Sequence, residues 1–288
     1  MTQINKVTIK EQLRSYLRHP YSLFLFVLVC LAALMTAGAF VGIVGYILIK
    51  GIPHLSLSLF DWKYTSENVS MMPAIINTLE MTVLALLFAV PFGIGAAVYM
   101  TEYARRGNKL VKLVGVTSET LSGIPSIVYG LFGSLFFVKA IGMGLSLLAG
   151  ALTLAIMILP LIMRTTEEAL RAVPDSYREG SFGLGAGKLR TVMKVVLPSA
   201  VPGILSGVIL GIGRIVGESA ALIFTAGTVA EVADSLLDSS RTLAVHMYTI
   251  SGEGLYINQT YATAVVLLVI VIVINALSSF AAKKLEKK

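Results

Sequence analysis

Residues 179–198 read EGSFGLGAGKLRTVMKVVLP, a glycine-rich and basic stretch between two long apolar runs. Three glycines at alternate positions, Gly183, Gly185 and Gly187, disfavour a continuous helix. From Lys188 onward, apolar residues recur at helical spacing and lead into the next apolar run. The stretch therefore predicts a short helix, a break and a second helix.

The segment before this stretch carries signals for the start of the short helix. Pro174 interrupts any helix that arrives from the preceding apolar run, and Ser176 with Glu179 has the spacing of a capping box. A short helix with small residues on one face can sit in the groove of another protein. An ordinary amphipathic connector at a membrane surface is the alternative.

The same stretch does not have the spacing of a nucleotide site. A P-loop requires glycine where Phe182 stands and serine or threonine where Leu189 stands. A dinucleotide fingerprint beginning at Gly183 requires its third glycine where Lys188 stands. We therefore expect that this chain binds no cofactor, ATP included.

Composition predicts a membrane protein. The 288 residues are 56% hydrophobic and 14% charged, whereas a soluble domain carries about 25% charged residues. An apolar run of about 20 residues suffices for a helix to cross a bilayer. Six runs qualify, and Pro91 and Pro125 interrupt the second and third: 22–49, 74–100, 113–138, 145–163, 199–226 and 258–282. The predicted fold is all-α, with six transmembrane helices.

Charge placement predicts the orientation. With the N-terminus in the cytoplasm, the cytoplasmic pieces 1–20, 101–112, 164–198 and 283–288 hold 18 Lys and Arg residues, and the outer pieces hold 4. The positive-inside rule then places both termini in the cytoplasm. We expect a cytoplasmic segment over 1–21, a transmembrane domain over 22–282 that includes the loop 164–198, and a cytoplasmic tail over 283–288.

The remaining charges and polar residues exclude other classes of site. The net charge of +7 comes from Lys and Arg residues in the predicted cytoplasmic pieces, so we expect no nucleic-acid partner. The three histidines have no metal-ligand spacing, and the single cysteine lies in an apolar run. The outer loops 50–72 and 227–257 could dock an external partner or be solvated connectors.

Residues 211–227, GIGRIVGESAALIFTAG, place Arg214 inside an apolar span. Glu218 follows four residues later, so the two side chains are expected to pair on one helix face. The pair could merely hold helices together. Alternatively, Arg214 faces a pathway and binds an oxyanion with its planar fork. Glu119 and Ser122 could line the same pathway, or Glu119 could lie near the cytoplasmic interface.

The stretch 179–198 resembles the cytoplasmic loop of ABC importer permeases, whose pattern is E-A-A-x3-G-x9-I-x-L-P. The matching positions are Glu179, Gly180, Ser181, Gly185, Val195, Leu197 and Pro198. Gly and Ser replace the two alanines, and Val replaces Ile. The resemblance implies a type I, MetI-like permease whose loop docks on an ATPase dimer, with Lys188 opening the helix after the break. ATP and Mg would belong to that partner, and the chain itself would be no enzyme.

Residues 211–227 are similar to the A-type permeases of phosphate ABC importers, whose pattern is R-x-x-G-E-[ST]-A followed by L-[LI]-F-T-A. Arg214, Gly217, Glu218, Ser219 and Ala220 match it, and 122–133, SGIPSIVYGLFG, resembles another span of that family. The chain departs from the pattern at Ala221, where the family has proline.

This second resemblance covers about residues 20–285 and implies the other subunits of the transporter. The chain would be a multi-pass permease of the inner or plasma membrane, surrounded by lipid. It would pair with a C-type permease, and an extracytoplasmic phosphate-binding protein would deliver inorganic phosphate. Arg214, Glu218, Ser219, Glu119 and Ser122 would line the pathway. The alternatives are a permease for molybdate or sulfate, the C-type phosphate permease, a secondary transporter or channel, and a membrane enzyme.

Overall fold

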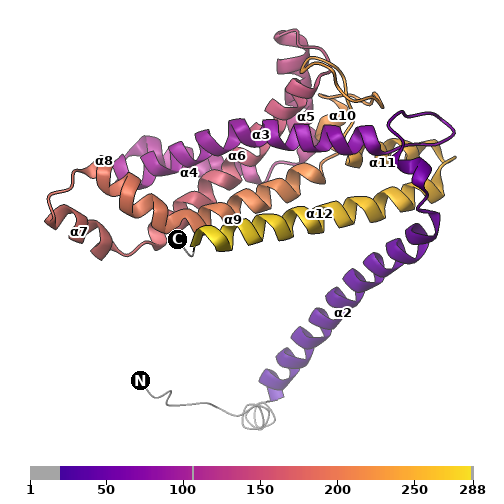
Figure 1. Ribbon diagram of the computed structural model, residues 1–288. Coiled ribbons are helices and arrows are strands. Elements are labelled where there is room, and N and C mark those ends of the chain that lie inside the picture. Colours follow the sequence, from indigo (N-terminus) through magenta and orange to yellow (C-terminus); the bar gives the residue numbers. More distant parts are fainter. Residues whose placement is uncertain (1–19, 106, 287–288) are drawn as a thin grey trace.

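The computed structural model describes residues 20–105 and 107–286, and these residues form helices and loops without any β-strand (Figure 1). In chain order the helices are α2 (Pro20–Gly51), η1 (Ile52–His54), η2 (Leu57–Phe60), α3 (Met72–Val98), η3 (Tyr99–Tyr103), α4 (Lys109–Ser122), α5 (Ser126–Gly133), η4 (Ser134–Ala140), α6 (Leu147–Ala172), α7 (Asp175–Gly183), α8 (Lys188–Thr191), η5 (Val192–Val196), α9 (Leu197–Val216), α10 (Ala220–Ile223), α11 (Leu243–Glu253) and α12 (Ile257–Glu286). The segments η3, η4 and η5 are π-helical.

The long helices α3, α6, α9 and α12 run along one axis, with α7 and α8 at one end of the bundle and α11 at the other (Figure 1). Five helices are long and apolar enough to cross a membrane: Pro20–His54, Met72–Tyr103, Leu147–Ala172, Lys188–Val216 and Ile257–Phe280. A pair of helices, Lys109–Ser122 with Ser126–Ala140, passes the same test together but is bent by 105°. The structure therefore has five spans, or the predicted six if the bent pair is counted as one, and several of the predicted boundaries were wrong.

Proline affects the second and third spans differently. The third span bends by 105° where Gly123–Pro125 separates α4 from α5, because proline lacks an N–H and disfavours helix in the residue before it. By contrast, α3 continues through Pro91, so the predicted interruption of the second span was wrong. A buried transmembrane helix can lose one backbone bond and still continue, because its neighbours hold it in place.

The core is built from small residues that allow the helices to approach closely. A Cβ atom at Gly93 of α3 would lie 2.8 Å from the Ile162 Cγ2 atom of α6. On the other side of α6, a Cβ at Gly203 of α9 would lie 2.5 Å from the Ala169 Cβ. Close approach of this kind holds helices together where lipid removes the hydrophobic driving force. As a result α3, α6 and α9 form one packed layer, and α12 packs against α9.

Helix α2 stands apart from this layer (Figure 1). It contacts the bundle at its C-terminal end, where Gly51 packs against the Tyr261 backbone and Val265 of α12. Most of its apolar side chains are exposed along its length. The proposed cytoplasmic segment 1–21 lies outside the described residues except for Pro20 and Tyr21, which belong to α2. At the other terminus α12 runs to Glu286, so most of the predicted tail 283–288 is helical.

Buried polar residues fix the loops at the α11 end. The guanidinium of Arg241 lies 4.5 Å from the ring centre of Tyr64, and His246 meets the same ring edge-on at 6.1 Å. The Asn77 amide of α3 donates hydrogen bonds to the Glu231 carbonyl at 2.8 Å and the Arg241 carbonyl at 3.3 Å. Burial lowers the pKa of Arg241, and burial with the charge of Arg241 lowers the pKa of His246 to about 3. These loops are thus partly integrated into the bundle.

Candidate functional site

Two helix breaks lie side by side in the bundle. One separates α4 from α5, and the other separates α9 from α10. They are adjacent because α5 packs on α10, where a Cβ at Gly130 would lie 2.7 Å from the Ala221 Cα. The Tyr129 hydroxyl donates a hydrogen bond of 2.7 Å to the Leu121 carbonyl and so bridges the first break. Broken helices that meet inside a membrane protein form substrate sites in many transporters.

Arg214 lies in the last turn of α9, next to the second break. Gly211, three residues earlier, faces Ile158 and Ile162 in the middle part of α6, which places Arg214 well inside the bundle. The Arg214 side chain is partly exposed and close enough to Tyr129 for its charge to act on the phenol. Within the described chain Arg214 forms no ion pair, so its guanidinium is available to a ligand.

The predicted pairing of Arg214 with Glu218 was wrong. Helix α9 ends at Val216, and Gly217 caps it, so the four-residue spacing no longer places both side chains on one face. Glu218 is buried, and its Oε1 accepts a hydrogen bond of 3.1 Å from the Ala221 N–H at the start of α10. Ser219 follows it within the break and makes no capping bond with its side chain. For the same reason the fifth span does not reach residue 226 as a single helix.

Glu119 and Ser122 lie together in the last turn of α4. The Ser122 hydroxyl donates a hydrogen bond of 2.9 Å to the Glu119 carbonyl. The exposed Glu119 carboxylate is 3.9 Å from the Arg164 guanidinium of α6, which also contacts Glu168 at 3.2 Å. The structure therefore separates the five proposed pathway residues into two groups, and no hydrogen bond or ion pair between described side chains joins them.

The loop 174–198 has the predicted helix, break and second helix. Helix α7 ends in a Schellman motif, in which Gly185 N–H bonds the Phe182 carbonyl at 2.9 Å and Ala186 N–H bonds the Ser181 carbonyl at 3.1 Å. Gly185 has a φ of +81°, a conformation that glycine adopts at little cost. The expected capping box was wrong: α7 begins at Asp175, after Pro174, without a side-chain capping bond.

The other loop residues divide between exposed and inward positions. Glu179 and Gly180 are exposed, whereas the Ser181 and Thr191 hydroxyls lie 2.9 Å apart and join α7 to α8. Lys188 lies over the Tyr103 ring at 5.2 Å from its centre. Leu197 and Pro198 begin α9. The tip of the loop exposes large apolar side chains: Tyr177, Phe182, Leu184, Leu189 and Met193.

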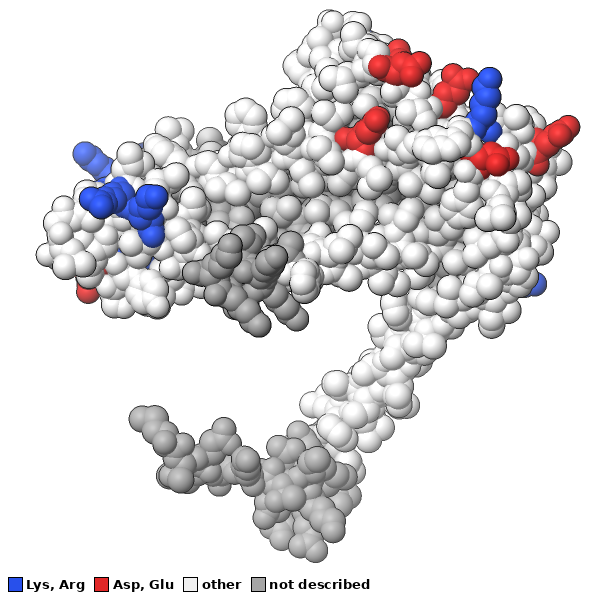
Figure 2. Space-filling model, viewed as in Figure 1, with Lys and Arg blue, Asp and Glu red and all other residues white. Residues whose placement is uncertain are grey.

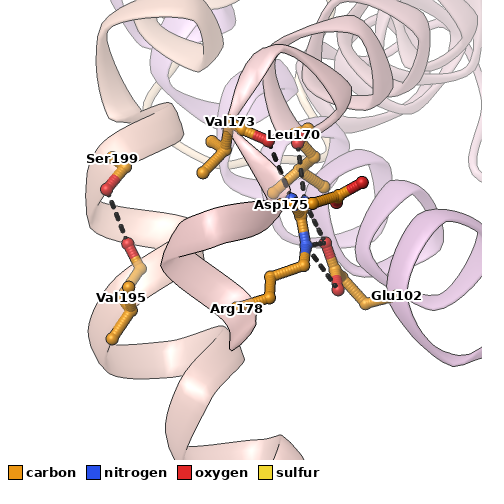
Figure 3. A network of polar contacts seen from close by, with 7 residues as sticks. All are labelled: Glu102, Leu170, Val173, Asp175, Arg178, Val195 and Ser199. Carbon is orange, nitrogen blue, oxygen red and sulfur yellow. Dashed lines mark hydrogen bonds and ion pairs between the residues drawn. The ribbon is translucent and has the colours of Figure 1, made fainter. Parts of the chain in front are cut away.

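The sequence reasoning missed the residues that attach α7 to the bundle. Arg178 of α7 contacts Glu102 of η3, with its Nη2 2.7 Å from Oε1, and both side chains are largely buried (Figure 3). The hydrogen bond with Glu102 raises the pKa of Arg178. The sequence marks only one of the two partners, because Glu102 is the single acidic residue among the basic residues of 101–112.

Residues 89–288 match the family described as binding-protein-dependent transport system inner membrane component. The chain is 35% identical over 240 residues to the probable ABC transporter permease protein YqgI of Bacillus subtilis (strain 168), covering 78% of this chain and 81% of that one. It is 32% identical to the phosphate transport system permease protein PstA of Mycobacterium leprae (strain TN), covering 76% and 75%. It is 30% identical to PstC of Pasteurella multocida (strain Pm70), covering 79% of each.

The fold has solved counterparts among ABC transporters. One is a chain of the inward-facing MetNI methionine ABC transporter, with a TM-score of 0.59 and 22% identity, covering 73% of this chain and 93% of that one. The likeness confirms the predicted MetI-like architecture. Taken with the family match, it shows that the chain belongs to the binding-protein-dependent transport system inner membrane components and is a multi-pass membrane permease of an ABC importer, a transport subunit rather than an enzyme.

Proposed function

We propose that the chain imports inorganic phosphate, as one half of a transmembrane pathway in which Arg214 meets the anion. The names of the relatives support this substrate, because two of them are phosphate transport system permeases. We place the permease domain at 22–282 and propose that ATP and Mg bind a partner ATPase, not this chain.

The observation that carries the proposal is the unpaired Arg214 beside two helix breaks. A charged side chain inside a membrane is costly unless it meets a counter-charge or a water-filled path. Arg214 has no acidic partner within the described chain, and Glu218 is held against the Ala221 N–H. A guanidinium presents paired N–H donors that match the oxygens of phosphate. The buried carboxylate nearby would weaken the grip on the anion, which favours its release.

A second permease would complete the pathway. Arg214 is partly exposed in the single chain, and α2 presents apolar side chains over nearly its whole length. Both features fit a subunit that packs against another membrane subunit. We favour a C-type permease as this partner, with the present chain as the A-type, because the R-x-x-G-E-S-A and L-I-F-T-A matches favour that type.

The ATPase dimer would bind the tip formed by α7 and α8. In the face shown in Figure 2, Lys and Arg gather mainly at this end, and Asp and Glu at the α11 end. By the positive-inside rule the α7 end then faces the cytoplasm. Exposed apolar side chains such as Leu184, which is 91% exposed, suit a groove in a partner. The α11 end would receive the phosphate-binding protein.

Reconstitution tests the proposal. The chain is placed in proteoliposomes with the C-type permease, the ATPase and the binding protein, and uptake of labelled phosphate, sulfate and molybdate is compared with and without ATP. We expect ATP-dependent uptake of phosphate. The Arg214→Gln variant should abolish uptake while the complex still assembles, whereas Arg171→Gln, an exposed arginine of α6, should retain it. Normal phosphate uptake by Arg214→Gln contradicts the pathway role, and preferred uptake of sulfate or molybdate contradicts the substrate. Assembly with an A-type partner instead would identify this chain as C-type.

A further inference from the structure

We propose that Arg178 is a positioning residue that makes α7 and the cytoplasmic end of α3 move as one rigid unit. The proposal rests on the proposed role of α7 as the contact for the ATPase. It adds the route by which movement of α7 enters the membrane: through the Glu102 carboxylate into α3, the second span.

The guanidinium of Arg178 joins three elements (Figure 3). Its Nη2 donates to Glu102 Oε1 at 2.7 Å, and its Nε lies 3.2 Å from the same oxygen. Its Nη1 donates to the Val173 carbonyl at 2.8 Å and to Asp175 at 3.2 Å, and Nη2 also donates to the Leu170 carbonyl at 2.9 Å. One side chain of α7 therefore holds η3 and the C-terminal end of α6, through the Leu170 carbonyl and that of the cap residue Val173.

The burial of this pair distinguishes it from a surface ion pair. The Arg178 and Glu102 side chains are 16% and 8% exposed. All three guanidinium nitrogens have partners, so the buried charge is compensated and its geometry is fixed. By comparison, Arg171 and Glu167 form an ion pair within α6 whose side chains are 68% and 21% exposed. An ion pair with so exposed an arginine contributes little to stability and does little to fix the positions of its side chains.

Two further contacts close the unit around η3. Lys188 lies over the Tyr103 ring, and the Ser181 and Thr191 hydroxyls join α7 to α8. A displacement of α7 would thus move both the second span and the start of α9. From α3 the packing continues through Gly93 to Ile162 of α6, and from Ile162 to Gly211 of α9, one turn before Arg214. The anchor therefore lies at one end of a continuous line of packed residues that ends beside the substrate position.

Three variants separate this role from a general effect on folding. Glu102→Gln removes the charge on η3 but leaves the bonds of Arg178 to the Leu170 and Val173 carbonyls. Arg178→Lys keeps the positive charge but lacks the paired N–H donors of the guanidinium, and Arg178→Gln removes both the charge and these donors. The matched controls are Arg171→Gln and Glu167→Gln, which break an arginine–carboxylate pair on the neighbouring helix whose arginine is exposed.

The first measurement is the number of phosphate ions imported per ATP hydrolysed by the reconstituted complex. We expect the ratio to fall about tenfold in Glu102→Gln and Arg178→Gln, a factor typical of coupling between two sites. ATP hydrolysis should be retained in both variants. Arg178→Lys should give an intermediate ratio. The controls should keep the native ratio. A native ratio in both Glu102→Gln and Arg178→Gln overturns the proposal. So does a parallel loss of hydrolysis and uptake in all three variants, because it indicates a structural role only.

The second measurement does not depend on the substrate. Spin labels are placed at exposed Ser176 of α7 and Tyr99 of η3, with Cys30 replaced by serine, and their separation is measured in the complex with and without ATP. We expect one narrow distribution that ATP leaves unchanged, and a broad one in Arg178→Gln. A distribution in Arg178→Gln as narrow as the native one refutes the anchor. A native complex that holds this distance but imports no phosphate would refute only the proposed substrate.

Discussion

Gly130 of α5 faces the backbone of Ala221 in α10 with no room for a side chain between them: a Cβ at position 130 would lie 2.7 Å from the Ala221 Cα and 3.0 Å from its carbonyl oxygen. The obstacle is backbone, which cannot rotate away as a flexible side chain could. This contact holds the two helix breaks side by side, and Arg214 lies next to the second of them.

Gly130→Ala should therefore disturb the site. The added methyl group must push α5 from α10, and overpacking of this kind costs about 1 to 3 kcal/mol. We expect a lower melting temperature in detergent and reduced phosphate uptake. The control is Gly115→Ala in α4, where a Cβ meets no atom within 4 Å and alanine favours the helix. Equal melting temperatures for Gly130→Ala and the native chain contradict the close approach.

Gly185→Ala tests the helix break in the loop 174–198. Alanine at a φ of +81° is strained by about 1 kcal/mol or more, so the Schellman motif should loosen and α7 should fray at its end. The expected result is faster hydrogen exchange over residues 181–187 and weaker binding of the ATPase. Gly183→Ala should have the opposite effect and slow the exchange, because Gly183 is part of α7 and a Cβ there meets open space. Slower exchange in Gly185→Ala would show that this position does not need glycine.

The loop 174–198 and the spans could be predicted from the sequence because their signals are local. Hydropathy identifies the spans, and the spacing of Gly183, Gly185 and Gly187 before Lys188 identifies the helix break. The Schellman motif also explains why Gly185 stands at the glycine of the family pattern. Ser181 stands where the family pattern has alanine, and its hydroxyl contacts the Thr191 hydroxyl of α8.

The parts that could not be predicted depend on partners far away in the chain. Arg178 and Glu102 are 76 residues apart, and nothing in the spacing of either reveals the other. The pairing of Arg214 with Glu218 failed for a different reason: it assumed an uninterrupted helix, whereas Gly217 ends α9 because α10 turns to pack on α5. Gly217 and Ser219 are residue types that favour helix ends, but the apolar residues on both sides of them favour one continuous helix, and the prediction followed the apolar residues.

The exposed tip of the loop 174–198 should bind the ATPase through both apolar contact and charge. Leu184→Ser removes the most exposed apolar side chain of the tip, and Glu179→Lys reverses an exposed charge on α7, the helix that Leu184 caps. Each should weaken binding of the purified ATPase about tenfold without lowering the melting temperature, as expected for residues at an interface. The comparison variant is Glu67→Lys, a charge reversal in an exposed loop at the opposite end. Native ATPase affinity in both loop variants would place the docking surface elsewhere.

His246 should make the stability of the α11 end depend on pH. Its side chain is fully buried beside Arg241, neither ring nitrogen has a hydrogen-bond partner in the described chain, and its pKa is about 3. An unfolded histidine has a pKa of about 6.5, so below that pH the unfolded state binds a proton that the folded state excludes. The stability contributed by neutral His246 is complete above about pH 6.5 and is lost as the pH falls toward 3.

At pH 5 this loss amounts to about 2 kcal/mol relative to pH 8. The measurement is the melting temperature in detergent at both pH values, for the native chain and for His246→Leu. Removing the titrating group should make the pH 5 and pH 8 values converge, whatever the substitution does to stability at pH 8. His54→Leu, which removes an exposed histidine at the same end of the bundle, should leave the difference in place. If His246→Leu retains the native difference, then other groups cause the acid sensitivity and the buried histidine does not contribute to it.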